Sequence, residues 1–121
     1  MGISILLIDE HSNSRYLNGC LFRQEIGCEV YEVSSIKEAY DVLKRQEIDY
    51  LIYDPIYNGK CQVNFLEKIK KSPNPPSVII YTNYICDYVN FPLPFFGPFP
   101  KPYIGKVVTL LSNVTKSQKW A

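Results

Sequence analysis

Three short, nearly continuous apolar runs constrain the fold of this chain most strongly. They cover residues 3–8, 50–53 and 77–81, and a polar residue follows each of them. Runs of this length without polar alternation are typical of parallel strands that are buried on both faces. Residues 29–33 alternate between polar and apolar side chains instead, which predicts a half-covered strand. A fifth strand is expected to end near Lys101.

Helical segments are predicted between these strands. Residues 13–26 predict the first helix, with Ser12 or Ser14 as its cap and Gly27 in the left-handed conformation after its end. The further helices are expected to open at the capping-box serine Ser35, to span residues 63–71 and to run from residue 104. Strands that alternate with helices predict an α/β fold, in which an open parallel sheet is covered on both faces.

A single domain accounts for the chain. Its 121 residues match the usual size of one domain, and 46% hydrophobic with 21% charged residues is ordinary globular composition. We place the domain at residues 1–115 and interpret the polar residues 116–121 as a tail or the start of a linker.

Charge and hydropathy exclude two classes of partner. A formal net charge of +1 provides no basic surface for direct binding to nucleic acid. No apolar run approaches the ~18–20 residues that span a membrane, and no basic leader precedes the first strand. We therefore expect a cytoplasmic protein with neither nucleic acid nor membrane as a partner.

Polar side chains gather at the ends of the predicted strands. Asp9 and Glu10 follow the first strand, Asp54 the third, Thr82 the fourth, and Lys101 the fifth. Because open parallel sheets bind ligands outside the carboxyl ends of their strands, all five residues are expected on one rim. Three carboxylates there would repel one another unless a cation lay among them. Hard oxygen ligands without a thiolate or an imidazole favour Mg²⁺.

Prolines alternate with other residues over 97–102. Proline lacks an N–H, and alternate residues of a strand aim their N–H groups at opposite sides, so the missing donors all face one side. Residues 97–101 are therefore predicted to form an edge strand. Phe99 and Lys101 would direct their backbone groups to the fourth strand, and the prolines would face solvent.

Four segments together resemble the receiver domain of two-component response regulators. They are LLIDE at residues 6–10, IDYLIYD at 48–54, VIIYT at 78–82 and GPFPKPY at 97–103. Their order and spacing make the resemblance specific, and it extends from residue 3 to about residue 114. The resemblance implies a CheY-like, flavodoxin-like, doubly wound sheet of five parallel strands in the order 2-1-3-4-5. It also implies a cis peptide between Lys101 and Pro102.

The resemblance implies a signalling module of a phosphorelay, not an enzyme. Asp54 would accept a phosphoryl group from a sensor histidine kinase or a phosphotransfer protein. Asp9 and Glu10 would hold Mg²⁺, with help from Asp54 and the backbone carbonyl of Ile56.

Two further residues receive roles from the same resemblance. Thr82 would hydrogen-bond the phosphoryl group, and Lys101 would pair with it. These roles agree with general chemistry. An aspartate carboxylate is already ionised at neutral pH and can act as a nucleophile, so the main obstacle to the reaction is its electrostatic repulsion of the incoming phosphate. Lys101 and Mg²⁺ would supply positive charge where negative charge develops.

The sequence also departs from the family pattern. Asn83 replaces the small residue that follows the threonine, and Pro98 replaces an aromatic residue. Because prolines at 92 and 94 cannot continue a helix, the fourth helix of the fold is expected to be truncated or absent. These departures support an alternative, a pseudo-receiver that binds a partner without being phosphorylated.

Four phenylalanines in residues 91–99 leave a second alternative open. Their rings would either fill the space of the missing helix or form an exposed apolar patch. Such a patch would dock a partner or a second copy of the chain as a homodimer.

Overall fold

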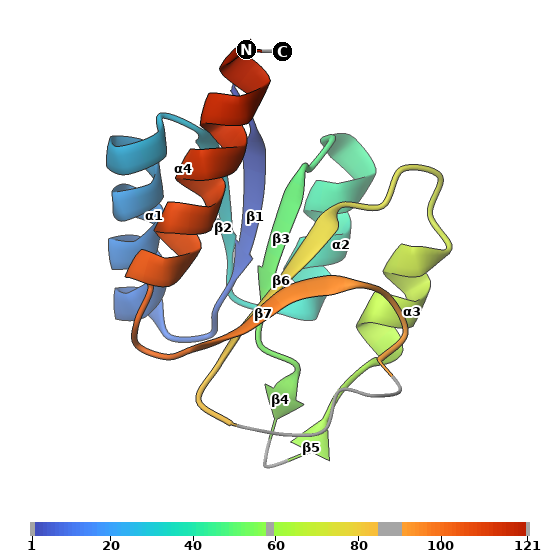
Figure 1. The fold of residues 1–121 in the computed structure, drawn as a ribbon. Coiled ribbons are helices and arrows are strands. Elements are labelled where there is room, and N and C mark those ends of the chain that lie inside the picture. The colour runs from blue at the N-terminus through green and yellow to red at the C-terminus, as the bar shows by residue number, and fades with distance from the viewer. Residues whose placement is uncertain (1, 58–59, 85–90, 121) are drawn as a thin grey trace.

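A five-stranded parallel sheet forms the centre of the molecule (Figure 1). The computed structural model describes residues 2–57, 60–84 and 91–120. The strands of the sheet are β1 (Ser4–Ile8), β2 (Glu29–Val33), β3 (Tyr50–Tyr53), β6 (Ser77–Thr82) and β7 (Phe95–Pro100). Their spatial order is β2-β1-β3-β6-β7, and every neighbouring pair is parallel. Counted within this sheet, the order is 2-1-3-4-5, which confirms the predicted doubly wound fold.

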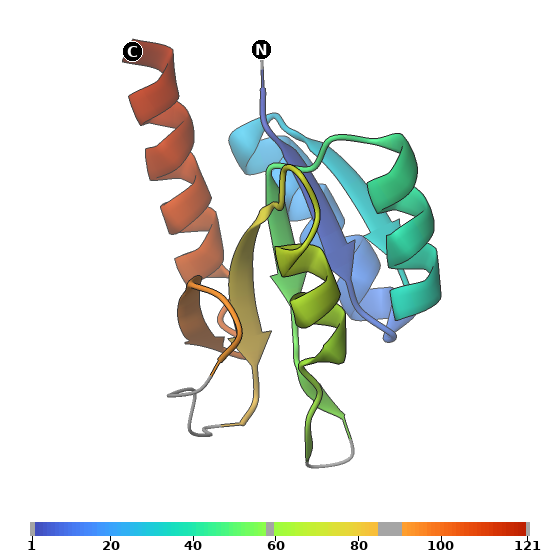
Figure 2. The same cartoon turned by 90° about the vertical axis from the view of Figure 1, so that its right-hand side faces the viewer.

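Helices cover both faces of the sheet, as Figures 1 and 2 show. They are α1 (Ser12–Ile26), α2 (Ile36–Arg45), α3 (Asn64–Lys70) and α4 (Gly105–Trp120). One hydrophobic core lies between the sheet and α1 with α4, and the other lies between the sheet and α2 with α3. Successive residues of β3 alternate between the two cores: Ile52 belongs to the first and Tyr53 to the second.

The start of α1 differs from the expectation. Its N-cap is His11, which makes no side-chain cap bond, so neither predicted serine caps the helix. The carboxylate of Asp9 accepts the N–H of His11 at 2.9 Å instead. The other signals are confirmed: Gly27 has a φ of 71°, and the Ser35 hydroxyl accepts the Glu38 N–H at 3.2 Å.

The edge-strand prediction is confirmed for the alternating prolines. β7 lies at the edge of the sheet beside β6, and the N–H of Lys101 donates to the Thr82 carbonyl at 3.0 Å. The strand begins at Phe95, two residues earlier than expected, and a bulge interrupts its register. At this bulge Gly97 has a φ of 104°, and the peptides that follow Gly97 and Lys101 are cis.

The connection between β6 and β7 contains no helix in its described residues, 83–84 and 91–94. Phe91, Leu93 and Phe95 pack against the core of the α2–α3 face. The rings of Phe91 and Phe95 also meet edge to face, with centroids 4.8 Å apart. These side chains fill space beside the edge of the sheet, which favours the first alternative, that the rings replace the missing helix. We call Phe91, Leu93 and Phe95 the plug. Phe96 is 41% exposed and lies outside this plug.

The plug predicts different stabilities for two neighbouring substitutions. Phe95→Ser is expected to lower the free energy of unfolding by about 2–4 kcal/mol, because it removes an aromatic ring from a core. Phe96→Ser should cost less than about 1 kcal/mol, because that ring is already partly in solvent. Urea unfolding of both variants measures the difference. Equal, small losses would contradict the plug, and a loss of self-association in Phe95→Ser at unchanged stability would favour docking.

Two further features lie outside the predicted elements. After β3, the two-residue strands β4 (Ile56–Tyr57) and β5 (Lys60–Cys61) pair antiparallel. The Asn-Gly pair at 58–59 is a turn signal in the sequence, and it lies outside the described residues. The backbone of α4 continues to Trp120, across the boundary placed after residue 115, so that boundary stays a prediction. No helix in the described part of the chain is long and apolar enough to cross a membrane.

Candidate functional site

An ion pair between Asp54 and Lys101 lies at the carboxyl edge of the sheet. The Lys101 ammonium is 3.0 Å from Oδ2 of Asp54, and both side chains are about four-fifths buried, with 22% and 20% exposed. The two residues are 47 positions apart in the sequence. Asp54 directly follows β3 and Lys101 directly follows β7, so the sheet topology brings together two residues that the sequence placed on one rim.

The second oxygen of Asp54 holds the loop that follows β3. Oδ1 accepts the N–H of Ile56 at 3.0 Å. The hydroxyl of the preceding residue, Tyr53, donates to the carbonyl of Gln62 at 3.3 Å. Burial, Cys61 and the Asp54 carboxylate, in that order, raise the pKa of Tyr53 to about 12, so the phenol stays neutral. The Asp54 carboxylate is thus fixed from both sides.

Asp9 lies beside Asp54. The register of the sheet aligns Leu7 with Ile52, so the residues two positions further along, Asp9 and Asp54, follow their strands side by side. Oδ1 of Asp9 accepts the His11 N–H, and the Asp9 carbonyl accepts the Arg15 guanidinium at 2.7 Å. The carboxylate therefore shapes the start of α1 as well as lining the cleft.

Glu10 lines the same cleft but is largely exposed. Its side chain is 66% exposed, and its carboxylate lies 3.8 Å from the ring of His11. Among the described residues, no three His, Cys, Asp or Glu side chains come close enough to hold a metal ion. The three carboxylates do not form the close cluster that the sequence suggested.

Thr82 is the last residue of β6, and it is not among the residues that line the cleft around Asp54 and Lys101. It is buried, with 3% exposed, and its Oγ1 accepts the N–H of Tyr84 at 3.2 Å. The Thr82 carbonyl accepts the Lys101 N–H, which fixes the backbone from which the lysine extends. A threonine hydroxyl that accepts one bond still carries a proton to donate.

Tyr81 belongs to the same cleft, although the sequence analysis did not single it out. The Lys101 ammonium lies 5.6 Å from the centre of its ring. Burial, and then the nearby Asp9 carboxylate, raise the pKa of Tyr81. The register of β3 and β6 was the signal available: Tyr53 aligns with Ile80, so Tyr81 is the lateral neighbour of Asp54.

An open cleft of about 1110 Å³ brings most of these residues together. Asp9, Glu10, Asp54, Tyr81 and Lys101 line it, and Asn83 and Tyr84 contribute to the same lining. Mg²⁺ usually takes one or two carboxylates and completes its shell with water and phosphate oxygens. The carboxylates of Asp9 and Asp54, with the carbonyl of Ile56 close by in sequence, fit that donor set. Thiolate and imidazole ligands are not needed.

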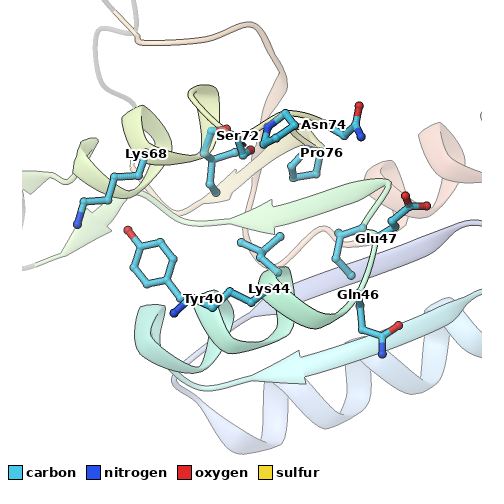
Figure 3. A pocket seen from close by; sticks show the side chains of 12 residues that line it. Tyr40, Lys44, Gln46, Glu47, Lys68, Ser72, Asn74 and Pro76 are labelled. Atoms are coloured by element: carbon cyan, nitrogen blue, oxygen red, sulfur yellow. Dashed lines mark hydrogen bonds between the residues drawn. The ribbon is translucent and has the colours of Figure 1, made fainter.

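A second, smaller cleft lies between α2 and α3 (Figure 3). Its volume is about 360 Å³, and Tyr40, Lys44, Lys68 and Asn74 are among the residues that line it. The segments that precede β3 and β6 form its wall, which places it at the amino edge of the sheet. It shares Tyr40 and Lys68 with the larger cleft, and neither Asp54 nor Lys101 reaches it.

Comparisons with known proteins agree on the fold. No protein-family model matches the chain. A protein of Cyanophora paradoxa, described as the probable transcriptional regulator ycf29, is 38% identical over 69 residues; the match covers 56% of this chain and 32% of that protein. The chain therefore spans about a third of the length of this relative.

Solved structures match over nearly the whole chain. A response regulator receiver domain of Clostridium thermocellum has a TM-score of 0.75 and 24% identity, and the match covers 97% of this chain and 96% of that one. The chemotaxis response regulator CheY4 of Vibrio cholerae has a TM-score of 0.74 and 14% identity, with 95% and 99% covered. The chain has the CheY-like fold of response regulator receiver domains.

Proposed function

We propose that this chain is a phosphoacceptor receiver module of a two-component signalling system. The ion pair between Asp54 and Lys101 carries the proposal. In the proposed reaction, a carboxylate oxygen of Asp54 attacks the phosphorus of a phosphohistidine on a sensor histidine kinase or a phosphotransfer protein. The new O–P bond forms as the P–N bond breaks, and the electron pair leaves with the imidazole.

The neighbouring residues stabilise charge and hold the acceptor. Lys101 places a positive charge beside Asp54, where the phosphoryl oxygens would arrive. The Thr82 carbonyl holds the Lys101 backbone, and the Thr82 hydroxyl would donate a hydrogen bond to a phosphoryl oxygen. Asp9, Asp54 and the Ile56 carbonyl would hold Mg²⁺, with Glu10 at the rim.

The metal, when bound, supplies positive charge that lowers the repulsion between Asp54 and an incoming phosphate. The side chains of the protein itself bind the phosphoryl group, orient the acceptor and neutralise negative charge. On this account the chain is a signalling module of the cytoplasm rather than an enzyme, and its partners are phosphodonor proteins.

Incubation with acetyl phosphate and Mg²⁺, followed by intact-mass spectrometry, tests the proposal. The wild-type chain should gain one phosphoryl group that is stable in acid and lost in base, and chelation of Mg²⁺ should prevent the gain. Asp54→Asn should abolish it, whereas Asp41→Asn, on an exposed position of α2, should not. A chain that stays unmodified with both acetyl phosphate and its kinase would contradict the proposal.

Asp9→Asn separates metal binding from helix capping. The substituted amide keeps an oxygen for the His11 N–H but loses the negative charge. We expect weaker Mg²⁺ binding by about tenfold or more, and a small gain of thermal stability in metal-free buffer from reduced repulsion with Asp54. Magnesium titration and thermal unfolding measure the two effects. Unchanged Mg²⁺ binding together with lower stability in the metal-free variant would instead leave Asp9 with a structural role only, at the start of α1.

A pseudo-receiver remains the second candidate, and one observation favours it. Asn83 and Tyr84 line the same cleft as Asp54, and both are exposed at its mouth. Bulk at this place would restrict the approach of a phosphodonor. Replacing Asn83 with alanine distinguishes the candidates if the wild-type chain is inert, because a blocked acceptor should then become reactive and a pseudo-receiver should not.

A further inference from the structure

We infer that the ring of Tyr81 is a positioning element that holds the Lys101 ammonium against Asp54. The expected effect on phosphorylation rests on the proposed function. The positioning of the Lys101 ammonium by the ring rests on the structure alone. Nothing in the comparisons assigns a role to Tyr81.

The lysine has to reach across a strand. Lys101 follows β7, Asp54 follows β3, and β6 lies between them. Neighbouring strands are about 4.8 Å apart, so about 10 Å separates β3 from β7. The lysine side chain therefore extends over the carboxyl end of β6. A chain with four rotatable bonds does not hold such a position by itself, because each rotor adds conformational entropy.

Tyr81 lies where this crossing takes place. It aligns with Phe99 on β7, and it is the lateral neighbour of Asp54 on the other side. Tyr81 and Phe99 both pack into the core of the α1–α4 face, and Lys101, two residues after Phe99, emerges on that face. The row of side chains on this face thus runs from Asp54 over Tyr81 to Lys101.

The ring is a fixed surface with the right electrostatics. Tyr81 is 6% exposed, and its neighbours in the core hold it in place. The ammonium lies 5.6 Å from the ring centre and 3.0 Å from Oδ2 of Asp54, so it has an aromatic face on one side and a carboxylate on the other. A cation over a partly desolvated ring corresponds to about a 2- to 30-fold change in an equilibrium constant.

The phenol is not required for this role, which supplies a matched pair of variants. Tyr81→Phe keeps the aromatic face, and Tyr81→Ile removes it while keeping a residue type that suits a buried strand. Reductive methylation with formaldehyde and a borane, mapped by peptide mass, reports how firmly Lys101 is held. Exposed Lys106 serves as the internal control.

We expect Lys101 to be methylated at the same rate in the wild type and in Tyr81→Phe, and about 2- to 30-fold faster in Tyr81→Ile. The rate for Lys106 should not change. With acetyl phosphate and Mg²⁺, Tyr81→Ile should slow phosphorylation by a similar factor, and it should have no further effect when Lys101 is replaced by alanine. A merely structural role for Tyr81 would persist in the alanine background.

Three results would overturn the role: Tyr81→Phe behaving like Tyr81→Ile, equal methylation in all variants, or an undiminished effect of Tyr81→Ile without Lys101. If no variant is phosphorylated, the proposed function fails, and the methylation rates alone decide the positioning role. Should Tyr81→Ile not fold, the wild-type NMR spectrum decides, because the ring should shift the Lys101 Hε protons upfield of those of Lys106. Unshifted protons would refute the contact.

Discussion

Lys101→Met is expected to slow the phosphorylation of Asp54 by about 10²–10³-fold, the usual effect of removing one preorganised group that stabilises developing charge. The substitution leaves Asp54 beside Asp9 without the cation that now lies 3.0 Å away. Single-turnover reactions with acetyl phosphate and Mg²⁺, followed by intact mass, measure the rate. Lys106→Met is the control, because Lys106 is exposed on α4.

An unchanged rate in Lys101→Met would show that the ion pair has no part in the chemistry. Lys101→Arg adds a sharper comparison. Its charge is kept, but the planar guanidinium requires another geometry between the Tyr81 ring and Asp54. We expect an intermediate rate for this variant.

Gly97→Ala is expected to lower the free energy of unfolding by about 2–4 kcal/mol. Gly97 has a φ of 104°, which a residue with a Cβ rarely adopts. The added carbon would lie 2.8 Å from both the Ile80 carbonyl oxygen and the Phe99 nitrogen, which are backbone atoms of two paired strands. Relief of this contact would require β7 to move away from β6.

The matched control for this prediction is Gly105→Ala. A Cβ at Gly105 meets nothing within 4 Å, and alanine favours the helix that begins there. Chemical unfolding of the two variants should therefore show a large loss for one and a small gain or no change for the other. Equal stabilities would contradict the bulge in β7.

Much of the fold could be predicted because its signals are local. Apolar runs identified β1, β3 and β6, and β2 was predicted with its observed bounds, Glu29–Val33. The capping box at Ser35 marked the start of α2, and α3 lies within the predicted range 63–71. Proline alternation placed β7 at the edge, since the missing N–H groups could not belong to a central strand.

The remainder depends on contacts between distant segments. The early start of β7 reflects the packing of Phe95 against the α2–α3 core, which no local pattern encodes. The hairpin of β4 and β5 has strands of two residues, too short for a periodic signal. The N-cap of α1 is His11 rather than a serine, and its N–H donates to Asp9, which lies outside the helix.

The candidate site was likewise predictable where local signals exist and not where it depends on contacts between distant segments. Strand ends identified Asp54 and Lys101, because the carboxyl ends of parallel strands meet at one edge. They did not indicate that the Glu10 side chain is 66% exposed, since exposure after a strand end depends on the path of the following loop. Tyr81 was missed because its importance comes from the lateral register between β3 and β6 and from the path of the lysine.

Reductive trapping of the phosphorylated residue tests whether Asp54 is the phosphoacceptor. The wild-type chain is treated with acetyl phosphate and Mg²⁺ and then with sodium borohydride, which reduces an acyl phosphate to an alcohol but leaves free carboxylates intact. Peptide mass mapping then locates the reduced side chain. We expect one reduced residue, at position 54, and none when Mg²⁺ is chelated. A reduced residue elsewhere, or none in the presence of phosphodonor and metal, would contradict this role of Asp54.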